Sequence, residues 1–411
     1  MIPKTMCIFS AHGDAPATVS DIELEVLREN AFQAQSIGVP QQIEVGFVAG
    51  EHIYDTDFTY AKNGFGPLLL FVLRIDTHNV PSNIKQAYKR MHEKAVAANK
   101  ENHLGFLSRQ EKREATELTN RQIAEELAAG KYRKSNMIPI LWDLQAKQLI
   151  FGSASVNAID QLHKIMRDVF NVELDQLTSG GIARQILSYK GNHFDFEDIR
   201  PTGYTPAPAA ALDTAELTDV LEIPFVPWAT ASVDMKDFLG NEFLMWLWWT
   251  HEDGDGEIQI GSDRYAKDTI SMMFDRSLQM ECAWGVGGKQ TLTGDGPTRL
   301  KEASEALASG KWPRKAGLLI SDNVDQWEFT LQADMMIAGS VKLPSTSEAQ
   351  SPREVVEHQI TATRRLCTVL RGMYETFVSV RFDEEAWKDT SQSMSAWIDR
   401  RHELISQTAT A

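Results

Sequence analysis

The feature of this sequence that most constrains its fold is an unbroken apolar run, GPLLLFVLRI, at residues 66–75. Glycine bounds the run on one side and Asn79-Val80-Pro81 bounds it on the other, and a short run with such flanks favours a buried strand. It is far too short to span a bilayer, as is FLMWLWW at residues 243–249. A chain of 411 residues is long enough for two or three domains and can bury a core around such a strand.

Two helices are expected directly after this strand. Ser82 can cap the first helix, which continues to about residue 100. The second helix opens at Ser108, where Glu111 three residues later completes a capping-box pattern. It stops at Gly130, which suits a left-handed C-cap.

Strand and helix signals alternate through the rest of the chain. NMIPILWD (136–143) and LQAKQLIFGSA (144–154) predict a hairpin, followed by an amphipathic helix at 156–170. AGLLIS and QWEFTLQAD, at 316–334, read as paired strands joined by the turn DNVD. Ser351-Pro352 starts a long helix. The expected class is α+β, multi-domain, with mixed sheets and long helices.

The composition divides the chain into three regions. Residues 1–200 hold the basic helices and the strand core, and a Pro, Ala and Thr-rich stretch then begins a Trp and Gly-rich middle region at 201–296. Residues 297–411 return to strands and a long helix. In the middle region WLWWT is expected to be a strand whose tryptophans pack in a core, with Asp-Gly turns leading as a hairpin into EIQIG.

The cysteines and the N-terminus indicate the compartment. Cys7, Cys282 and Cys367 are widely scattered and lack metal-site spacing, which favours a reducing cytosol. The N-terminal stretch has no long apolar segment, so we expect neither a secretory signal nor a membrane partner.

Two glycine-containing stretches resemble ligand loops but lack required residues. GVGGKQT would need glycine at position 283 and Ser or Thr after Lys289, where the chain has Ala283 and Gln290. HEDGDGEIQIG, numbered from Asp253 as a calcium loop, places Ile258 sixth and arginine twelfth. Both are predicted to be turns.

One acidic stretch leaves an alternative open. HFDFEDI at 193–199 would place His193, Asp195 and Glu197 on one face of a strand, where they could hold the divalent cation of a nuclease. A polar strand face opposite two phenylalanines is the simpler interpretation. No zinc spacing and no G-x-S-x-G sequence is present. We therefore expect no metal, no cofactor and no enzymatic activity.

Positive charge is concentrated in one segment. The chain has 41 Lys and Arg against 57 Asp and Glu, a formal net charge of −16. Residues 81–135 hold twelve Lys and Arg against seven Glu, which is +5, so the remainder carries −21. A second basic cluster, KWPRK, lies at 311–315. Such clusters can neutralise phosphates, or they can be solvated faces with ion pairs inside each helix.

An ordered series of local patterns supports the phosphate-binding interpretation. The patterns are LRENAF (27–32), GFVAG (46–50), NGFGPLLLFVLRIDTHNVPSNIKQA (63–87), LSRQEK (107–112), GKYRKSNMIPILWD (130–143), LIFGSASVNAIDQLHKIMR (149–167), ALASGKWPRKAGLLI (306–320), GSVKLP (339–344) and ATRRLCTVLRGMYETF (362–377). In order and spacing the series resembles the RdgC family of recombination-associated DNA-binding proteins. Residues 201–296 match the family poorly and look expanded or divergent.

The resemblance implies a homodimer that closes into a ring around double-stranded DNA and binds it independently of sequence. It also implies restraint of a RecA-type recombinase and a cytoplasmic, nucleoid-associated location. An acidic exterior is compatible with this, because a basic channel focuses positive potential inside. Tyr132 matches the aromatic of the family's dimer gate. The basic position beside it falls on Gly130 or Lys131, depending on a one-residue shift, and we choose Lys131.

The charge pattern and the resemblance together define a set of candidate DNA-binding residues. Two alternatives remain: a metal-dependent DNA exonuclease, and a protein-interaction module whose Trp-rich region recruits a recombinase. The candidate DNA-binding residues are Lys85, Lys89, Arg90, Arg109, Lys112, Lys131, Arg133, Lys134, Lys311, Arg314 and Lys315.

Overall fold

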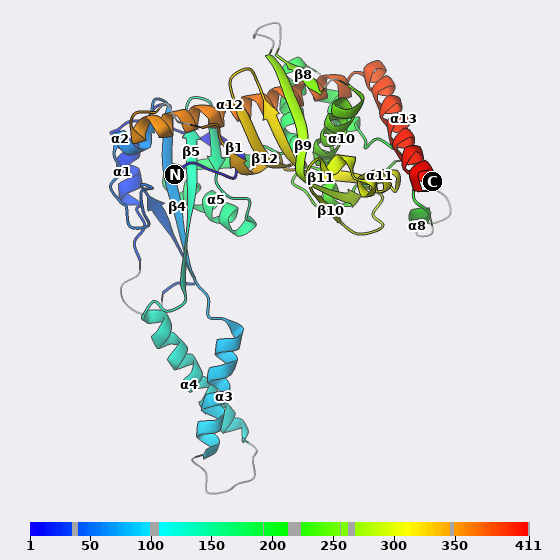
Figure 1. Ribbon diagram of the computed structural model, residues 1–411. Helices are drawn as coiled ribbons and strands as arrows, with labels where there is room; N and C mark the ends of the chain where they lie inside the picture. The colour runs from blue at the N-terminus through cyan, green and yellow to red at the C-terminus, as the bar shows by residue number, and fades with distance from the viewer. Residues whose placement is uncertain are drawn as a thin grey trace. The chain divides into compact units, whose positions relative to one another are not determined.

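The computed structural model shows two compact units (Figure 1). The first comprises Met1, His12–Lys147 and Ser155–Glu173, and the second comprises Ile2–Ala11, Gln148–Ala154 and Leu174–Ala411. The structure describes residues 1–34, 40–98, 107–191, 193–212, 223–254, 256–261, 268–345 and 349–409.

The sheet of the first unit is built on β4 (Leu68–His78), the strand predicted from the apolar run. It pairs antiparallel with β2 (Ile43–Val48) on one side and with β5 (Arg133–Asp143) on the other. The short β3 (Gly64–Phe65) pairs with the start of β4. Every residue of β4 except Thr77 is buried, which confirms the predicted buried strand.

Three helices accompany these strands: α1 (Asp21–Glu29), α2 (Tyr60–Asn63) and α5 (Val156–Phe170). The last of them is the predicted amphipathic helix. Its Phe170 ring lies 5.2 Å from the ring of Trp142 on β5, in an edge-to-face contact that fixes the helix against the sheet.

Two long helices lie between β4 and β5 in the chain: α3 (Ser82–Ala98) and α4 (Arg109–Ala128). They lie side by side beyond the ends of these two strands (Figure 1). We call the described residues 82–98 and 107–128 the arm. The predicted capping box of Ser108 and Glu111 is present, and Gly130 has the expected left-handed backbone, with φ +76°. No residue of α3 is buried, so polar contacts carry much of the pairing.

The second unit contains an antiparallel sheet with β9 (Asp268–Cys282) and β11 (Lys311–Ser321) at its centre. β12 (Gln326–Gln332) pairs with β11 in the register predicted for a hairpin, with the last residue of β11 opposite the first of β12. The predicted strands around residues 136–154 also form, as β5 and β6. Two further strands, β8 (Glu257–Ile260) and β10 (Gln290–Thr293), pair with β9, and β13 (Ile337–Lys342) pairs with β12. Strand β1 (Cys7–Gly13) pairs with β6 (Gln148–Phe151). Strand β7 (Val172–Gln176) follows later in the chain.

The helices of this unit pack around an aromatic core. Phe243 contacts Tyr374 and Phe377 at ring distances of 5.2 and 5.6 Å, and Trp248 contacts Trp397 at 5.6 Å. The helices are α6 (Ser179–Lys190), α7 (His193–Asp198), α8 (Ala209–Leu212), α9 (Pro227–Thr230), α10 (Phe238–Asp253), α11 (Lys301–Ala308), α12 (Pro352–Arg381) and α13 (Glu384–Ala409), with 3₁₀ turns at Met235–Asp237 and Pro297–Arg299.

The expected strand at WLWWT is wrong, because these residues lie in α10. Every position from Phe238 to Trp248 is buried. A helix that is buried all round has no polar face, so its sequence lacks the 3.6-residue period and resembles a buried strand. The predicted hairpin into EIQIG is therefore wrong as well, since a helix precedes β8. The expectation that the tryptophans pack in a core holds for Trp246 and Trp248, which are 7% and 0% exposed.

The expected strand at HFDFEDI is also wrong, because these residues form α7. Residues two apart on a helix point in different directions, so the polar strand face proposed for a cation does not exist. Phe196 is buried at 2% exposure, whereas Glu197 is exposed. The side chains of His193 and Asp195 lie outside the described residues.

Candidate nucleic-acid interface

The basic residues of α3 are exposed, while two other side chains of the helix bond to α4. Tyr88 and His92, four residues apart, face α4: the Tyr88 hydroxyl donates to Glu126 at 2.7 Å, and His92 Nε2 lies 2.9 Å from Gln122 Oε1. The cations of this helix are all exposed. They are the predicted Lys85, Lys89 and Arg90, together with Lys94, which sequence reasoning did not select.

The first turns of α4 also expose cations. Arg109, Lys112 and Arg113 are all exposed, and the last of these was not selected from the sequence. A simple solvated helix face would hold ion pairs between residues four apart. Within the described part of the arm, one such pair is present, with Arg121 Nε 4.0 Å from Glu125 Oε1. Ion pairing inside the helices therefore does not account for most of the arm's positive charge.

Three donors meet at the carboxylate of Glu126, two from the loop after α4 and one from α3. Lys131 Nζ lies 2.5 Å from Glu126 Oε1, and the hydroxyl of Tyr132 donates to Oε2 at 2.5 Å. The hydroxyl of Tyr88 is the third donor. Hydrogen bonds from Lys131, then Tyr132 and Tyr88, hold the pKa of Glu126 at about 2. In return, the hydrogen bond to Glu126 raises the pKa of the Lys131 amine.

Tyr132, the candidate gate residue, is held inside this cluster. Its side chain is partly buried, and its backbone has φ +100°, a value that residues other than glycine rarely adopt. The hydroxyl of Tyr132 is bonded to Glu126 of its own chain, and burial adds to this bond in raising the pKa of the phenol. Contact with a second copy stays a prediction.

Arg133 and Lys134 are adjacent but have different roles. Arg133 Nε lies 2.5 Å from Asp76 Oδ2, and Asp76 also accepts two hydrogen bonds from Arg74, at 2.9 and 2.6 Å. Burial opposes ionisation of Asp76, but the hydrogen bonds from Arg74 and Arg133 outweigh it and lower the pKa of the carboxyl. Arg133 thus fixes the loop to the sheet, whereas Lys134 is exposed and forms no ion pair among the described residues.

In the second basic cluster, at 311–315 in the other unit, the fold neutralises one of the three cations. Arg314 bonds to Glu281 and to Asp334, both at 2.7 Å. Lys311 Nζ donates to Gln290 Oε1 at 2.9 Å, and Lys315 is exposed on β11. Of the three predicted cations here, Lys315 is the one that is exposed and forms no ion pair or side-chain hydrogen bond among the described residues.

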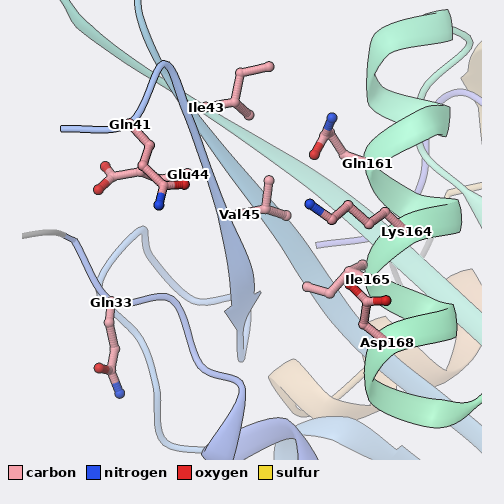
Figure 2. A pocket seen from close by; sticks show the side chains of 9 residues that line it. All are labelled: Gln33, Gln41, Ile43, Glu44, Val45, Gln161, Lys164, Ile165 and Asp168. Atoms are coloured by element: carbon pink, nitrogen blue, oxygen red, sulfur yellow. The ribbon is translucent and has the colours of Figure 1, made fainter.

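A cavity of about 430 Å³ lies between β2 and α5 (Figure 2). Ile43 and Val45 line it from the strand, and Lys164 and Asp168 point toward them from one face of the helix. Its lining mixes apolar groups, amides and both charges, without the convergence of like functional groups that would specify a reaction.

Within the described residues, no group of three or more His, Cys, Asp or Glu residues is placed to hold a metal ion. Within the same ranges, no helix has the length and apolar character needed to cross a membrane.

Comparison with known protein families found no matching family, and comparison with curated proteins found no match.

Proposed function

We propose that this chain binds double-stranded DNA without sequence preference, through the exposed cations of the arm and of the loop that follows it. The observation that carries the proposal is a set of eight exposed cations that form no ion pair within the described residues. They are Lys85, Lys89, Arg90, Lys94, Arg109, Lys112, Arg113 and Lys134.

The distribution of these cations favours a backbone ligand. The 17 residues of α3 extend for roughly 26 Å, so its cations can meet successive phosphates of one duplex. Contacts to phosphates position a protein on DNA but carry no sequence information. The acidic remainder of the chain would repel the same phosphates and so restrict binding to the arm.

The aromatic residues of this region favour a duplex over a single strand. Proteins that bind single strands stack bases on exposed aromatic rings. In the described part of the arm and its loop, Tyr88 and Tyr132 are both partly buried and both bonded to Glu126. Neither ring is free to receive a base in this arrangement.

The resemblance to the RdgC family extends the proposal to assembly and biological role. Two copies would close into a ring around the duplex, and by occupying DNA they would restrain strand exchange by a RecA-type recombinase at the nucleoid. The ordered series of motifs supports this part. Light scattering with and without DNA tests it, combined with retention on circular and linear DNA: a ring stays on closed circles and slides off linear ends.

A salt titration tests DNA binding directly. Fluorescence anisotropy with two unrelated 30-base-pair duplexes should give similar affinities, with log K falling linearly as log salt rises. Changing Lys85, Lys89 and Arg90 together to Glu should weaken binding to both duplexes equally. A flat response to salt, or no binding at low salt, would contradict the proposal.

A matched variant controls for net charge. Lys147, Lys164 and Lys388 are exposed and lie outside the arm, and changing all three to Glu alters the net charge by the same amount. This variant should bind DNA nearly as well as the unchanged protein. Equal loss in both triple variants would mean that total charge, and not the arm, governs binding.

A further inference from the structure

Glu126 carries a negative charge at the centre of the proposed interface. It comes from the last turn of α4, and its side chain is 17% exposed, while that of its partner Lys131 is 56% exposed. The lysine amine therefore reaches solvent while bound to a carboxylate. The sequence gives no direct sign of this pair, because the chain turns back at Gly130 to bring the two residues together.

Backbone and side-chain bonds both tie the loop to Glu126. The backbone N–H of Lys131 donates to the carbonyl of Glu126 at 3.0 Å, in addition to the ion pair between their side chains. Tyr132 keeps its unfavourable φ of +100° while its hydroxyl bonds to the same carboxylate. Backbone conformations of this kind persist only when the surroundings hold them, and they are concentrated at functional sites.

The carboxylate and a DNA phosphate would compete for the same amine. Both are anionic acceptors of the three donors on a lysine amine, and Lys131 directs donors to Glu126 and, at 3.5 Å, to the hydroxyl of Tyr88. A phosphate that approaches Lys131 meets the negative charge of Glu126 within a few ångströms.

We propose that Glu126 is a positioning residue that limits the affinity of this interface: its carboxylate occupies the place at Lys131 that a backbone phosphate takes when duplex DNA binds. This inference rests on the proposed function. Glu126 both shapes the loop and cancels one cation, and the variant Glu126→Gln separates these effects. The amide keeps one acceptor oxygen for a tyrosine hydroxyl, its NH2 can donate to the oxygen of the other hydroxyl, and it has no charge.

The first experiment measures DNA affinity against salt for Glu126→Gln. Release of one lysine should steepen the slope of log K against log salt by about 0.9 and tighten binding roughly fivefold to tenfold at 0.1 M salt. Glu117→Gln is the matched control, since Glu117 is exposed on the same helix and forms no ion pair within the described residues, and it should change affinity much less. Unchanged or weaker binding by Glu126→Gln would overturn the inference.

A double variant tests whether the gain acts through Lys131. In the double variant Glu126→Gln, Lys131→Gln, the gain in DNA affinity seen for Glu126→Gln alone should disappear. The effects of the two substitutions would then not add, whereas those of independent sites would. Lys131→Gln alone should weaken binding more than Lys134→Gln, because it leaves the carboxylate unpaired beside the phosphate. A gain that survives in the double variant would show that Lys131 is not the residue released.

A measurement without DNA separates this inference from the proposed function. Acetylation of lysines by N-hydroxysuccinimide acetate, followed by mass spectrometry, reports how freely each amine reacts. Lys131 should react more slowly than Lys134 in the unchanged protein and at a similar rate in Glu126→Gln. Fast reaction of Lys131 in the unchanged protein would refute the pair itself. Protection of Lys131 in a protein that binds no DNA would refute the proposed function instead.

Discussion

Two short stretches of this chain, KYRK at 131–134 and KWPRK at 311–315, have nearly the same pattern of cations around an aromatic residue, yet their surroundings differ. In the first, Lys134 is exposed and Lys131 shares a carboxylate with two tyrosines. In the second, Arg314 is held between two carboxylates. In each stretch the fold leaves one exposed lysine, Lys134 or Lys315, without an ion pair among the described residues. The first stretch differs because it follows the arm, whose other exposed cations are also uncompensated, and only there do we propose a phosphate site.

The largest effect is expected from Arg314→Ala. It leaves the buried Asp334 without its cation and Glu281 with Lys289 alone, and breaking such a partly buried network should cost about 3 kcal/mol in the free energy of unfolding. Urea denaturation measures this loss. Lys315→Ala should leave stability unchanged. DNA affinity per folded molecule should be similar for Arg314→Ala and the unchanged protein. If the Arg314→Ala variant is as stable as the unchanged protein but binds DNA poorly, Arg314 contributes to DNA binding and not to stability, which would contradict this prediction.

A smaller loss of stability is expected from Arg133→Ala. Asp76 is fully buried and would keep only Arg74 as its charged partner, so the variant should lose roughly 1 to 3 kcal/mol in the free energy of unfolding. The control is urea denaturation of Lys134→Ala under the same conditions, since the exposed side chain of Lys134 forms no ion pair among the described residues. Equal stability of the two variants would mean that Arg133 does not anchor the loop.

Lys134→Gln should act on DNA binding alone. Loss of one phosphate contact should lower the slope of log K against log salt by about 0.9, with the melting temperature unchanged. The same substitution at Lys311, whose amine bonds to Gln290, should alter the slope less. If Lys311→Gln alters the slope more, the second stretch contributes to the interface and the distinction drawn above fails.

The smallest expected effect is on stability at low pH. Because folding lowers the pKa of Glu126 to about 2, the stability that this group contributes is present above its unfolded pKa and is lost as the pH falls toward 2. Carbon-13 NMR of the carboxyl should show Glu126 ionised from about pH 5 down to about pH 3. In Lys131→Gln it should take up its proton at a higher pH. Identical titrations in the two proteins would mean that Lys131 does not stabilise the carboxylate.

Much of the fold could be predicted where the signal is local. The apolar run of β4, the capping box of α4 and the Ser-Pro start of α12 each lie within a few residues of the element they define. The helix α10 could not be identified in this way, because burial on every side removes the periodicity that distinguishes a helix from a strand.

The candidate site was predicted only in part, for the same kind of reason. Exposed cations such as Lys85 and Lys112 could be chosen from charge and helical spacing. The counter-charges could not, because Asp76 meets Arg133 across paired strands and Glu126 meets Lys131 only after the chain reverses. Charge count alone therefore treats Arg133, Arg314 and Lys134 as equivalent, although only the last is uncompensated among the described residues.

The absence of buried residues from α3 also bears on how this interface can evolve. Substitutions in a core are limited by packing, whereas exposed positions usually change stability by no more than about 0.5 kcal/mol. Gain or loss of a lysine along α3 should therefore alter the strength of binding while leaving the fold intact. If α3 binds DNA as proposed, selection can adjust its affinity in small, nearly independent steps, without compensating changes in the sheet of the same unit.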